Sequence, residues 1–218
     1  MSSGFATAPT PTSTGRPITA DLQRVARRIG IAAPLLWLAL IAWGDLYRSD
    51  IDAVTDYISE LGERGSSTAG VFGTVGFLFT GLLYVVLAAT LPMFLRGRWR
   101  TAVVAVLLAF EGIGRMGAGA YPCDPGCDGV SRAQELHGLF ATLGFSSGVL
   151  AALVAGVVYR RRIDILLGLA AAGFLLLLTW ESNPLPAVGL WERLATAALS
   201  VWLIVFSRRW QGDASDRQ

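Results

Sequence analysis

Residues 71–95 read VFGTVGFLFTGLLYVVLAATLPMFL, residues 101–121 read TAVVAVLLAFEGIGRMGAGAY, and only RGRWR lies between them. A helix needs about 20 apolar residues, within a range of roughly 17–25, to cross the hydrocarbon core of a bilayer. Both stretches have that length. Because lipid offers backbone amides no hydrogen-bond partner, each stretch must satisfy its own amides as a helix. The short arginine-rich connection makes the two stretches an antiparallel transmembrane hairpin.

Four more apolar stretches flank this hairpin, so the chain is predicted to have six transmembrane helices. Only 16% of its 218 residues are charged and 53% are hydrophobic, whereas about a quarter of a soluble domain is usually charged. We predict an all-α polytopic membrane protein with a six-helix bundle over residues 25–208. Residues 1–24, rich in Ser, Thr and Pro, are expected to be a disordered cytoplasmic tail, and residues 209–218 a second cytoplasmic tail. The further stretches are Ile29–Tyr47, Leu136–Tyr159, Ile163–Trp180 and Trp191–Phe206, the last extended back to Pro186.

The arginines predict the orientation of the bundle. All 18 basic residues are arginine, and positively charged loops stay in the cytoplasm. One side of the predicted bundle carries Arg16, Arg24, Arg27, Arg28, Arg96, Arg98, Arg100, Arg160, Arg161, Arg162, Arg208, Arg209 and Arg217. The other side carries only Arg48, Arg64, Arg132 and Arg193, together with an acidic cluster. Both termini are therefore predicted to face the cytoplasm from the cell (inner) membrane.

A short amphipathic helix is predicted at Asp50–Leu61, on the outer side between the first two spans. Its apolar residues recur at intervals of three and four, the pattern of one helix face; they are Ile51, Val54, Ile58 and Leu61. Ser49 or Asp50 can cap its start, and Gly62 can end it in the left-handed conformation. The segment is either a structural lid or the lining of a polar mouth, with Asp56, Ser59 and Glu60 off the apolar face.

Two opposite charges lie inside the predicted span 101–121. Glu111 and Arg115 are four residues apart, so they share a helix face and can pair. An unpaired charge near mid-bilayer costs at least ~2.5–3.5 kcal/mol on insertion scales, and pairing, burial or water must reduce that cost. The pair either fixes helix packing or forms a site for a ligand, lipid headgroup or proton. In such a site Arg115 is the natural partner of a phosphate or carboxylate.

His137 is the only histidine and opens the fourth span on the outer side. One histidine cannot supply a three-histidine zinc site or the two axial ligands of a membrane cytochrome. His137 is either a hydrogen-bonded residue at the helix start or a proton acceptor or ligand contact at the outer mouth. Asp45 and Glu181 end the first and fifth spans at the same level, and we interpret both as solvated interfacial acids.

The two cysteines, Cys123 and Cys127, flank Asp-Pro-Gly in the loop between the third and fourth spans. Pro-Gly favours a tight turn, and the loop is predicted to face an oxidising compartment, where disulfides persist. We therefore predict a disulfide between the two cysteines. The alternative is a metal site that they form with an aspartate and His137.

The chain carries, in this order, TDYISELG at 55–62, YPCDPGC at 121–127 and LH at 136–137. Together these motifs resemble the bacterial membrane protein family called domain of unknown function 998, and the resemblance covers about residues 30–208. It implies a six-helix inner-membrane protein without an established activity, distantly similar to the Frag/DRAM/Sfk membrane proteins, some of which are linked to lipid handling. The family's marked positions in this chain would be Asp56, Ser59, Gly62, Cys123, Asp124, Cys127 and His137.

The function that these features favour is non-enzymatic binding of a lipid headgroup or small anionic ligand in an outward-facing polar cavity. The expected ligand-binding residues are Asp56, Ser59, Glu60, Glu111, Arg115 and His137. The expected partners are the lipid bilayer and that ligand, and six spans also allow an oligomer. A net charge of +2 and the lack of a phosphate loop or dinucleotide fingerprint do not suggest nucleic acids or nucleotides. We assign no catalytic residue, metal or cofactor.

Two alternative functions stay open. An outward-facing hydrolase or acyltransferase would use Ser59, His137 and Asp56 or Asp124 as nucleophile, base and orienting acid. Against it, no Gly-x-Ser-x-Gly elbow is expected, and Ser59 is expected on a mobile segment. A proton-coupled transporter would need a charged path across the bundle, and the sequence suggests no buried charge in the cytoplasmic half.

Overall fold

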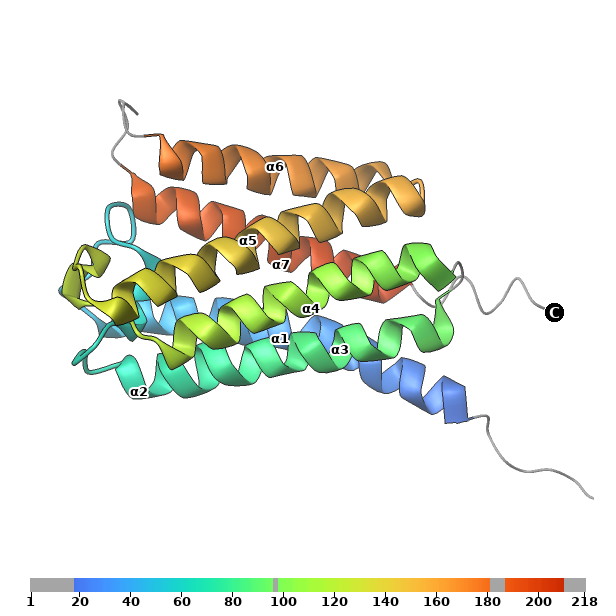
Figure 1. Ribbon diagram of the computed structural model, residues 1–218, viewed down its shortest axis with the longest axis horizontal. Coiled ribbons are helices and arrows are strands. Elements are labelled where there is room, and N and C mark those ends of the chain that lie inside the picture. Colours follow the sequence, from blue (N-terminus) through green and yellow to red (C-terminus); the bar gives the residue numbers. More distant parts are fainter. Residues whose placement is uncertain (1–17, 96–97, 181–186, 210–218) are drawn as a thin grey trace, which may run out of the picture.

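The computed structural model describes residues 18–95, 98–180 and 187–209, which form helices with short connections (Figure 1). Six helical spans are long and apolar enough to cross a membrane, and the described ranges contain no strand. The all-α, six-span prediction is confirmed. The spans are α1 (Ile18–Tyr47), α2 with η2 and α3 (Ala69–Val71, Phe72–Phe79 and Thr80–Phe94), α4 (Arg98–Ala120), α5 (Arg132–Val158), α6 (Arg162–Thr179) and α7 (Val188–Arg208).

The expected tails lie mostly beyond this part of the chain. Residues 1–17 and 210–218 are outside the described residues, as is Pro186 at the expected start of the sixth span. α1 begins at Ile18, so the end of the segment expected to be a disordered tail is helical.

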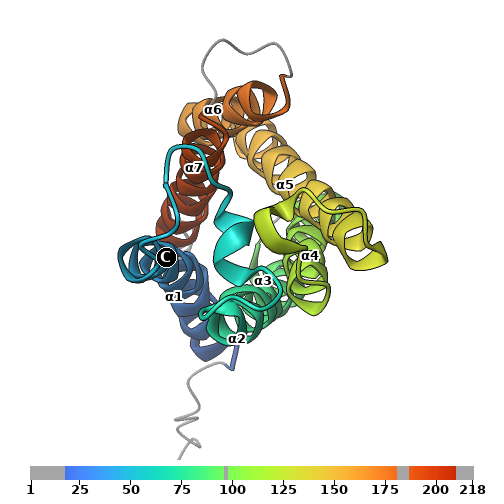
Figure 2. The ribbon, with the colours of Figure 1, turned by 90° about the vertical axis from the view of Figure 1, so that its left-hand side faces the viewer.

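The six spans form a ring. Each span packs on its neighbour in chain order, and α1 closes the ring by packing on both α3 and α7. Viewed end-on, the short 3-10 helix η1 (Ile58–Gly62) lies at the centre of the ring (Figure 2). α1 starts and α7 ends at the same end of the bundle (Figure 1). We call the opposite end, which residues 48–68 and 121–131 close, the capped end.

Glycines allow the spans to approach closely where the polar residues lie. A Cβ built on Gly112 of α4 would come within 2.6 Å of the carbonyl oxygen of Gly81 in α3. Small residues permit such backbone contact between membrane helices. Next to this contact, η2 is a π-helical stretch within the second span. Such stretches are rare and often found at functional sites, and Phe77 of η2 contributes to the cavity described below.

The predicted short helix between the first two spans is present, but it is the 3-10 helix η1 at Ile58–Gly62 and does not extend over Asp50–Leu61. The Asp52 carboxylate accepts a hydrogen bond from the Val54 amide, and the Asp56 carboxylate accepts one from the Asp52 amide. Such local side-chain bonds compete with helix formation. The left-handed glycine is Gly65, not Gly62. The expected apolar face is only partly buried, with Ile58 and Leu61 in the core and Val54 exposed.

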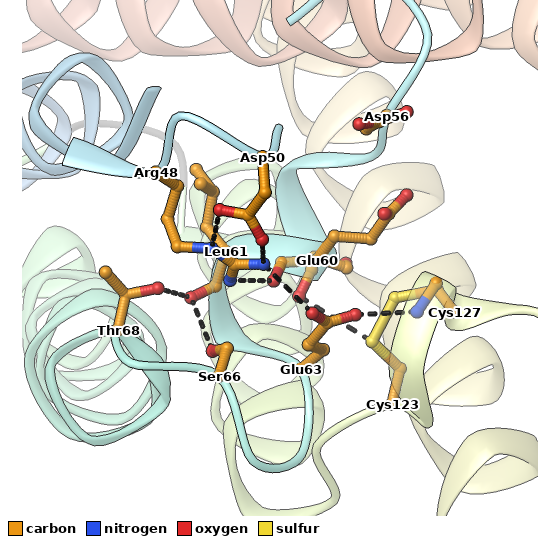
Figure 3. A network of polar contacts seen from close by, with 12 residues as sticks. Arg48, Asp50, Asp56, Glu60, Leu61, Glu63, Ser66, Thr68, Cys123 and Cys127 are labelled. Carbon is orange, nitrogen blue, oxygen red and sulfur yellow. Dashed lines mark hydrogen bonds and ion pairs between the residues drawn. A yellow bond between two sulfur atoms is a disulfide. The ribbon is translucent and has the colours of Figure 1, made fainter. Parts of the chain in front are cut away.

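Arginines at the capped end tie this segment to the bundle. Arg48 donates to the carboxylates of Asp50 and Glu63 and to the carbonyl oxygen of Glu60 (Figure 3). The hydrogen bonds from Arg48 lower the pKa of the Asp50 carboxyl to about 2. Glu63 in turn accepts a 2.6 Å hydrogen bond from the amide of Gly126 in the second capping loop. The two loops therefore form one connected cap.

Asp45 is not the solvated acid that we expected. Arg193 of α7 binds both of its carboxylate oxygens, at 3.0 and 2.6 Å, and also donates to the carbonyl oxygen of Asp56 at 2.8 Å. This arginine therefore connects α1, α7 and the capping segment. Glu181, for which we made the same prediction, lies outside the described residues.

The end of the bundle opposite the cap does contain a buried charge, which corrects the expectation that it would not. Asp164, in the first turn of α6, is fully buried, and neither of its carboxylate oxygens has a hydrogen-bond partner in the described part of the chain. Arg161 and Arg209 are its nearby opposite charges. The sequence did not indicate its burial, because Asp164 lies just after the arginines of a predicted loop. Only the packing of the helices buries it.

Candidate functional site

Two neighbouring cavities lie beneath the cap. The inner cavity has a volume of about 50 Å³ and lies among α1, η1, η2, α4, α5 and α7. The side cavity has a volume of about 340 Å³ and lies among residues 57–59, α5, α6 and α7. The residues that line both are Ser59, Ala141, Phe145 and Glu192. A water molecule needs roughly 10–15 Å³ of such space, so the inner cavity has room for a few waters or one small polar group.

Glu111 and Arg115 form the predicted ion pair, and both line the inner cavity. Their side chains are only 4% and 13% exposed, and Arg115 Nη2 lies 3.7 Å from Glu111 Oε1. That distance is too long for a hydrogen bond. Arg115 Nε and Nη1 and Glu111 Oε2 have no hydrogen-bond partner within the described ranges. The pair therefore neutralises charge while leaving donors and an acceptor unused.

Two aromatic rings hold the Arg115 guanidinium in place. Its Cζ lies 4.8 Å from the ring centroid of Trp37 in α1 and 4.9 Å from that of Tyr84 in α3. Cation–π contacts of this kind stabilise a cation where water is scarce. These contacts position the guanidinium, while its Nε and Nη1 have no hydrogen-bond partner within the described ranges.

His137 joins the cap to α4 and α5. Its Nδ1 lies 3.1 Å from the carbonyl oxygen of Ala118 and 3.0 Å from that of Tyr121, while its Nε2 lies 2.9 Å from Ser59 Oγ. We had predicted that His137 opens α5. That prediction is wrong, because α5 begins at Arg132 with Ser131 as its N-cap. It is a buried side chain in a three-element contact.

Glu192 is a site residue that sequence reasoning missed. It is buried in α7, lines both cavities, and accepts a 2.7 Å hydrogen bond from the Ile58 amide. The available signal was an acid within an apolar stretch, followed at intervals of four by Thr196 and Ser200. That spacing places all three on one helix face, and all three are buried.

Asp56 and Glu60 line neither cavity among the described residues. The Asp56 carboxylate accepts from the Thr55 hydroxyl as well as from the Asp52 amide, and Glu60 Oε1 accepts from the Tyr57 amide at 2.8 Å. Burial raises the pKa of the Glu60 carboxyl. Of the six predicted ligand-binding residues, the fold therefore brings Ser59, Glu111, Arg115 and His137 to the cavities and leaves Asp56 and Glu60 in the cap (Figure 3).

The predicted disulfide between Cys123 and Cys127 is present, with the two Cα atoms 5.1 Å apart. Gly126 and Cys127 both adopt positive φ angles, of 71° and 52°, so the chain turns sharply enough to bring the sulfurs together. The disulfide occupies both thiols of the alternative metal site. In the part of the chain that the structure describes, no group of three or more His, Cys, Asp or Glu side chains is arranged to hold a metal.

The Ser–His–Asp arrangement that the alternative hydrolase or acyltransferase would need does not form. Asp124 accepts hydrogen bonds from the amide and hydroxyl of Ser131, which lower the pKa of its carboxyl, and Asp56 is bound within the cap. Backbone carbonyls take the place of an orienting acid on His137. The letters of a Gly-x-Ser-x-Gly motif occur at 144–148, but they lie within the continuous helix α5 and cannot form an elbow.

Comparison with known proteins identifies the family. Residues 31–209 match the family model described as "Protein of unknown function (DUF998)". The chain belongs to this family. The match confirms the resemblance drawn from the cap and histidine motifs, and it includes every cavity residue named above. Neither a curated protein nor a solved structure matches the chain. Because the DUF998 description states no activity, any function must be argued from the geometry of the cavities. The likeness to Frag/DRAM/Sfk proteins and the bacterial source stay predictions.

Proposed function

We propose that this DUF998 protein is a multi-pass protein of the cell membrane, with both termini in the cytoplasm, that binds an anionic headgroup or small anion from the opposite side. The observation that supports it most is Arg115, a cation lining the inner cavity with two N–H groups that have no hydrogen-bond partner among the described residues. A buried cation with unused donors favours an anionic acceptor, because charge-assisted hydrogen bonds are about twice as strong as neutral ones.

The surroundings of Arg115 also indicate what kind of anion fits. Glu111 and Glu192 line the same cavity, and their carboxylates would repel a bare, multiply charged anion. They would accept hydrogen bonds from hydroxyl groups instead. The ligand that best fits therefore combines one negative group, facing Arg115, with hydroxyl donors, as in the phosphoglycerol or sugar headgroup of an anionic lipid.

The side cavity suits the apolar part of such a ligand. Phe145 of α5 and Leu175 and Leu178 of α6 contribute apolar lining, while Ser59 and Glu192 connect it to the inner cavity. Its volume of about 340 Å³ falls in the range of roughly 300–1,000 Å³ that is usual for ligand sites. A lipid that enters between α5 and α6 would place its headgroup near Arg115 and its chain against these residues.

Native mass spectrometry of the protein, delipidated in detergent and then titrated with phosphatidylglycerol, tests this proposal. The parent is expected to retain the lipid, and Arg115→Gln to bind it about 10–100-fold more weakly, because one charge-assisted hydrogen bond contributes about 1.5–3 kcal/mol. Arg132→Ala is the matched control, since the Arg132 side chain is 79% exposed and pairs only at the surface with Glu135.

Phosphatidylcholine and inorganic phosphate separate the sources of affinity. Retention of phosphatidylglycerol over phosphatidylcholine supports an anionic lipid headgroup, whereas displacement by millimolar phosphate supports a free anion. If Arg115→Gln binds phosphatidylglycerol as tightly as the parent and Arg132→Ala do, the proposed site is wrong.

A further inference from the structure

The Ser59–His137 contact has a defined hydrogen-bond direction. Both groups near His137 Nδ1 are carbonyl oxygens, those of Ala118 and Tyr121. Carbonyl oxygens only accept hydrogen bonds, so Nδ1 must carry a proton. In the neutral ring Nε2 is then the acceptor, and the Ser59 hydroxyl donates to it across 2.9 Å. A serine hydroxyl that donates to the free nitrogen of a histidine is the arrangement of an activated nucleophile.

The end of α4 holds the ring of His137 in one tautomer and orientation. α4 ends at Ala120, so the carbonyl oxygens of Ala118 and Tyr121 belong to the negative end of that helix. They do for His137 one of the things that the buried aspartate does in a catalytic triad, which is to fix the tautomer and orientation of the imidazole.

Ser59 lies on a fixed element and not on the mobile segment that we expected. Its neighbours Ile58 and Leu61 are buried, and the Ile58 amide donates to Glu192 of α7. Ser59 itself lines both cavities. The nucleophile is therefore held in place and is open to a ligand from the apolar side cavity and from the Arg115 side.

The geometry points to Ser59 as the nucleophile and His137 as the general base in transfer of an acyl group from a lipid ester. This inference rests on the proposed function in one respect, since the substrate would occupy the same two cavities. The acyl chain would lie along Phe145, Leu175 and Leu178 in the side cavity. The ester carbonyl would then lie at Ser59, where the two cavities meet.

The reaction balances with these groups and water alone. Ser59 Oγ attacks the ester carbonyl carbon while its proton passes to His137 Nε2. The carbon–oxygen bond to the alcohol breaks, and the departing oxygen takes the proton from Nε2, which leaves an acyl group on Ser59. Water, or a second alcohol, then attacks that carbonyl carbon and gives its proton to Nε2. The bond to Oγ breaks, and Oγ recovers the proton.

Labelling of the detergent-purified protein with an alkyl fluorophosphonate, followed by peptide mass spectrometry, tests this inference. We expect one adduct, on the peptide that contains Ser59, and none after Ser59→Ala. His137→Gln is expected to slow labelling about 10²–10⁴-fold, the usual contribution of a general base. Ser67→Ala is the matched control, because Ser67 is exposed in the capping segment and lines neither cavity, and it should label at the parental rate. Ser146, the serine of the Gly-x-Ser-x-Gly letters, should carry no adduct.

The outcome with the parent protein decides the question even if a His137 variant does not fold. No adduct on Ser59, or an adduct on Ser146 instead, would show that the Ser59–His137 hydrogen bond only anchors the cap. Labelling of His137→Gln at the parental rate would also overturn the inference. Retention of phosphatidylglycerol by Ser59→Ala, measured in parallel, separates this result from the proposed function. Lipid binding by the parent without labelling of Ser59 would contradict only the role of Ser59 as a nucleophile. Labelling of Ser59 without Arg115-dependent lipid binding would contradict only the headgroup site.

Discussion

Replacing Arg193 with alanine should cost the protein a large part of its stability, because this residue ties three parts of the capped end together. Arg193 makes hydrogen bonds of 3.0 and 2.6 Å to the Asp45 carboxylate, and others of 2.8 and 3.1 Å to the carbonyl oxygens of Asp56 and Gly189. Its side chain is 13% exposed and that of Asp45 is 21% exposed. Removing one partner of a buried pair costs about 3–5 kcal/mol, and partial exposure places Arg193→Ala near the lower end of that range.

The measurement is thermal or denaturant unfolding in detergent, alongside Arg132→Ala. About 3 kcal/mol corresponds to a fall in Tm of about 6–12 °C for a chain of this size, whereas the exposed Arg132–Glu135 pair should contribute no more than ~1 kcal/mol. The double variant Arg193→Ala with Asp45→Ala should be less destabilised than the sum of the two single variants, because neither charge is left without its partner. A fall for Arg193→Ala no larger than that for Arg132→Ala would refute the reasoning.

Three further predictions follow from packing, protonation and topology. Gly112→Leu should destabilise the bundle by at least about 1–3 kcal/mol in the same unfolding assay, because a Cβ at this position meets the backbone of α3 and the helices become overpacked. Gly138→Ala should not destabilise the bundle, because the space around Gly138 is open. Hydrogen bonds lower the pKa of the Asp124 carboxyl in the folded state, so the stability that this carboxylate contributes is present above the ordinary aspartate pKa and is lost as the pH falls through the lowered value. The parent should therefore have a higher Tm than Asp124→Asn at pH 7, and this difference in Tm should disappear in acid. A difference in Tm that persists in acid would contradict this prediction. A reporter fused after Gln218 should be active only in the cytoplasm, and activity on the other side would overturn the proposed orientation.

Much of the candidate site could be foreseen where its residues are close in sequence. The Glu111–Arg115 pair follows from a spacing of four on one helix, and the Cys123–Cys127 disulfide follows from a Pro-Gly turn. The capping segment could not be read in the same way, because Asp52 and Asp56 satisfy backbone amides with their own side chains and end the helical pattern that the apolar residues suggest. Asp164 and Glu192 were missed because their burial depends on neighbouring helices.

By itself, the sequence determined the six spans and their hairpin connections, because bilayer thickness and helix geometry act on residues that are near one another in the chain. Its short motifs at 55–62, 121–127 and 136–137 indicated the family. Only the tertiary structure decided that Ser59 meets His137 and that Ile58 meets Glu192, since these contacts join residues 78 and 134 positions apart. They depend on η1 entering the centre of a closed ring of helices, and no local pattern of apolar residues specifies which side chains will meet there.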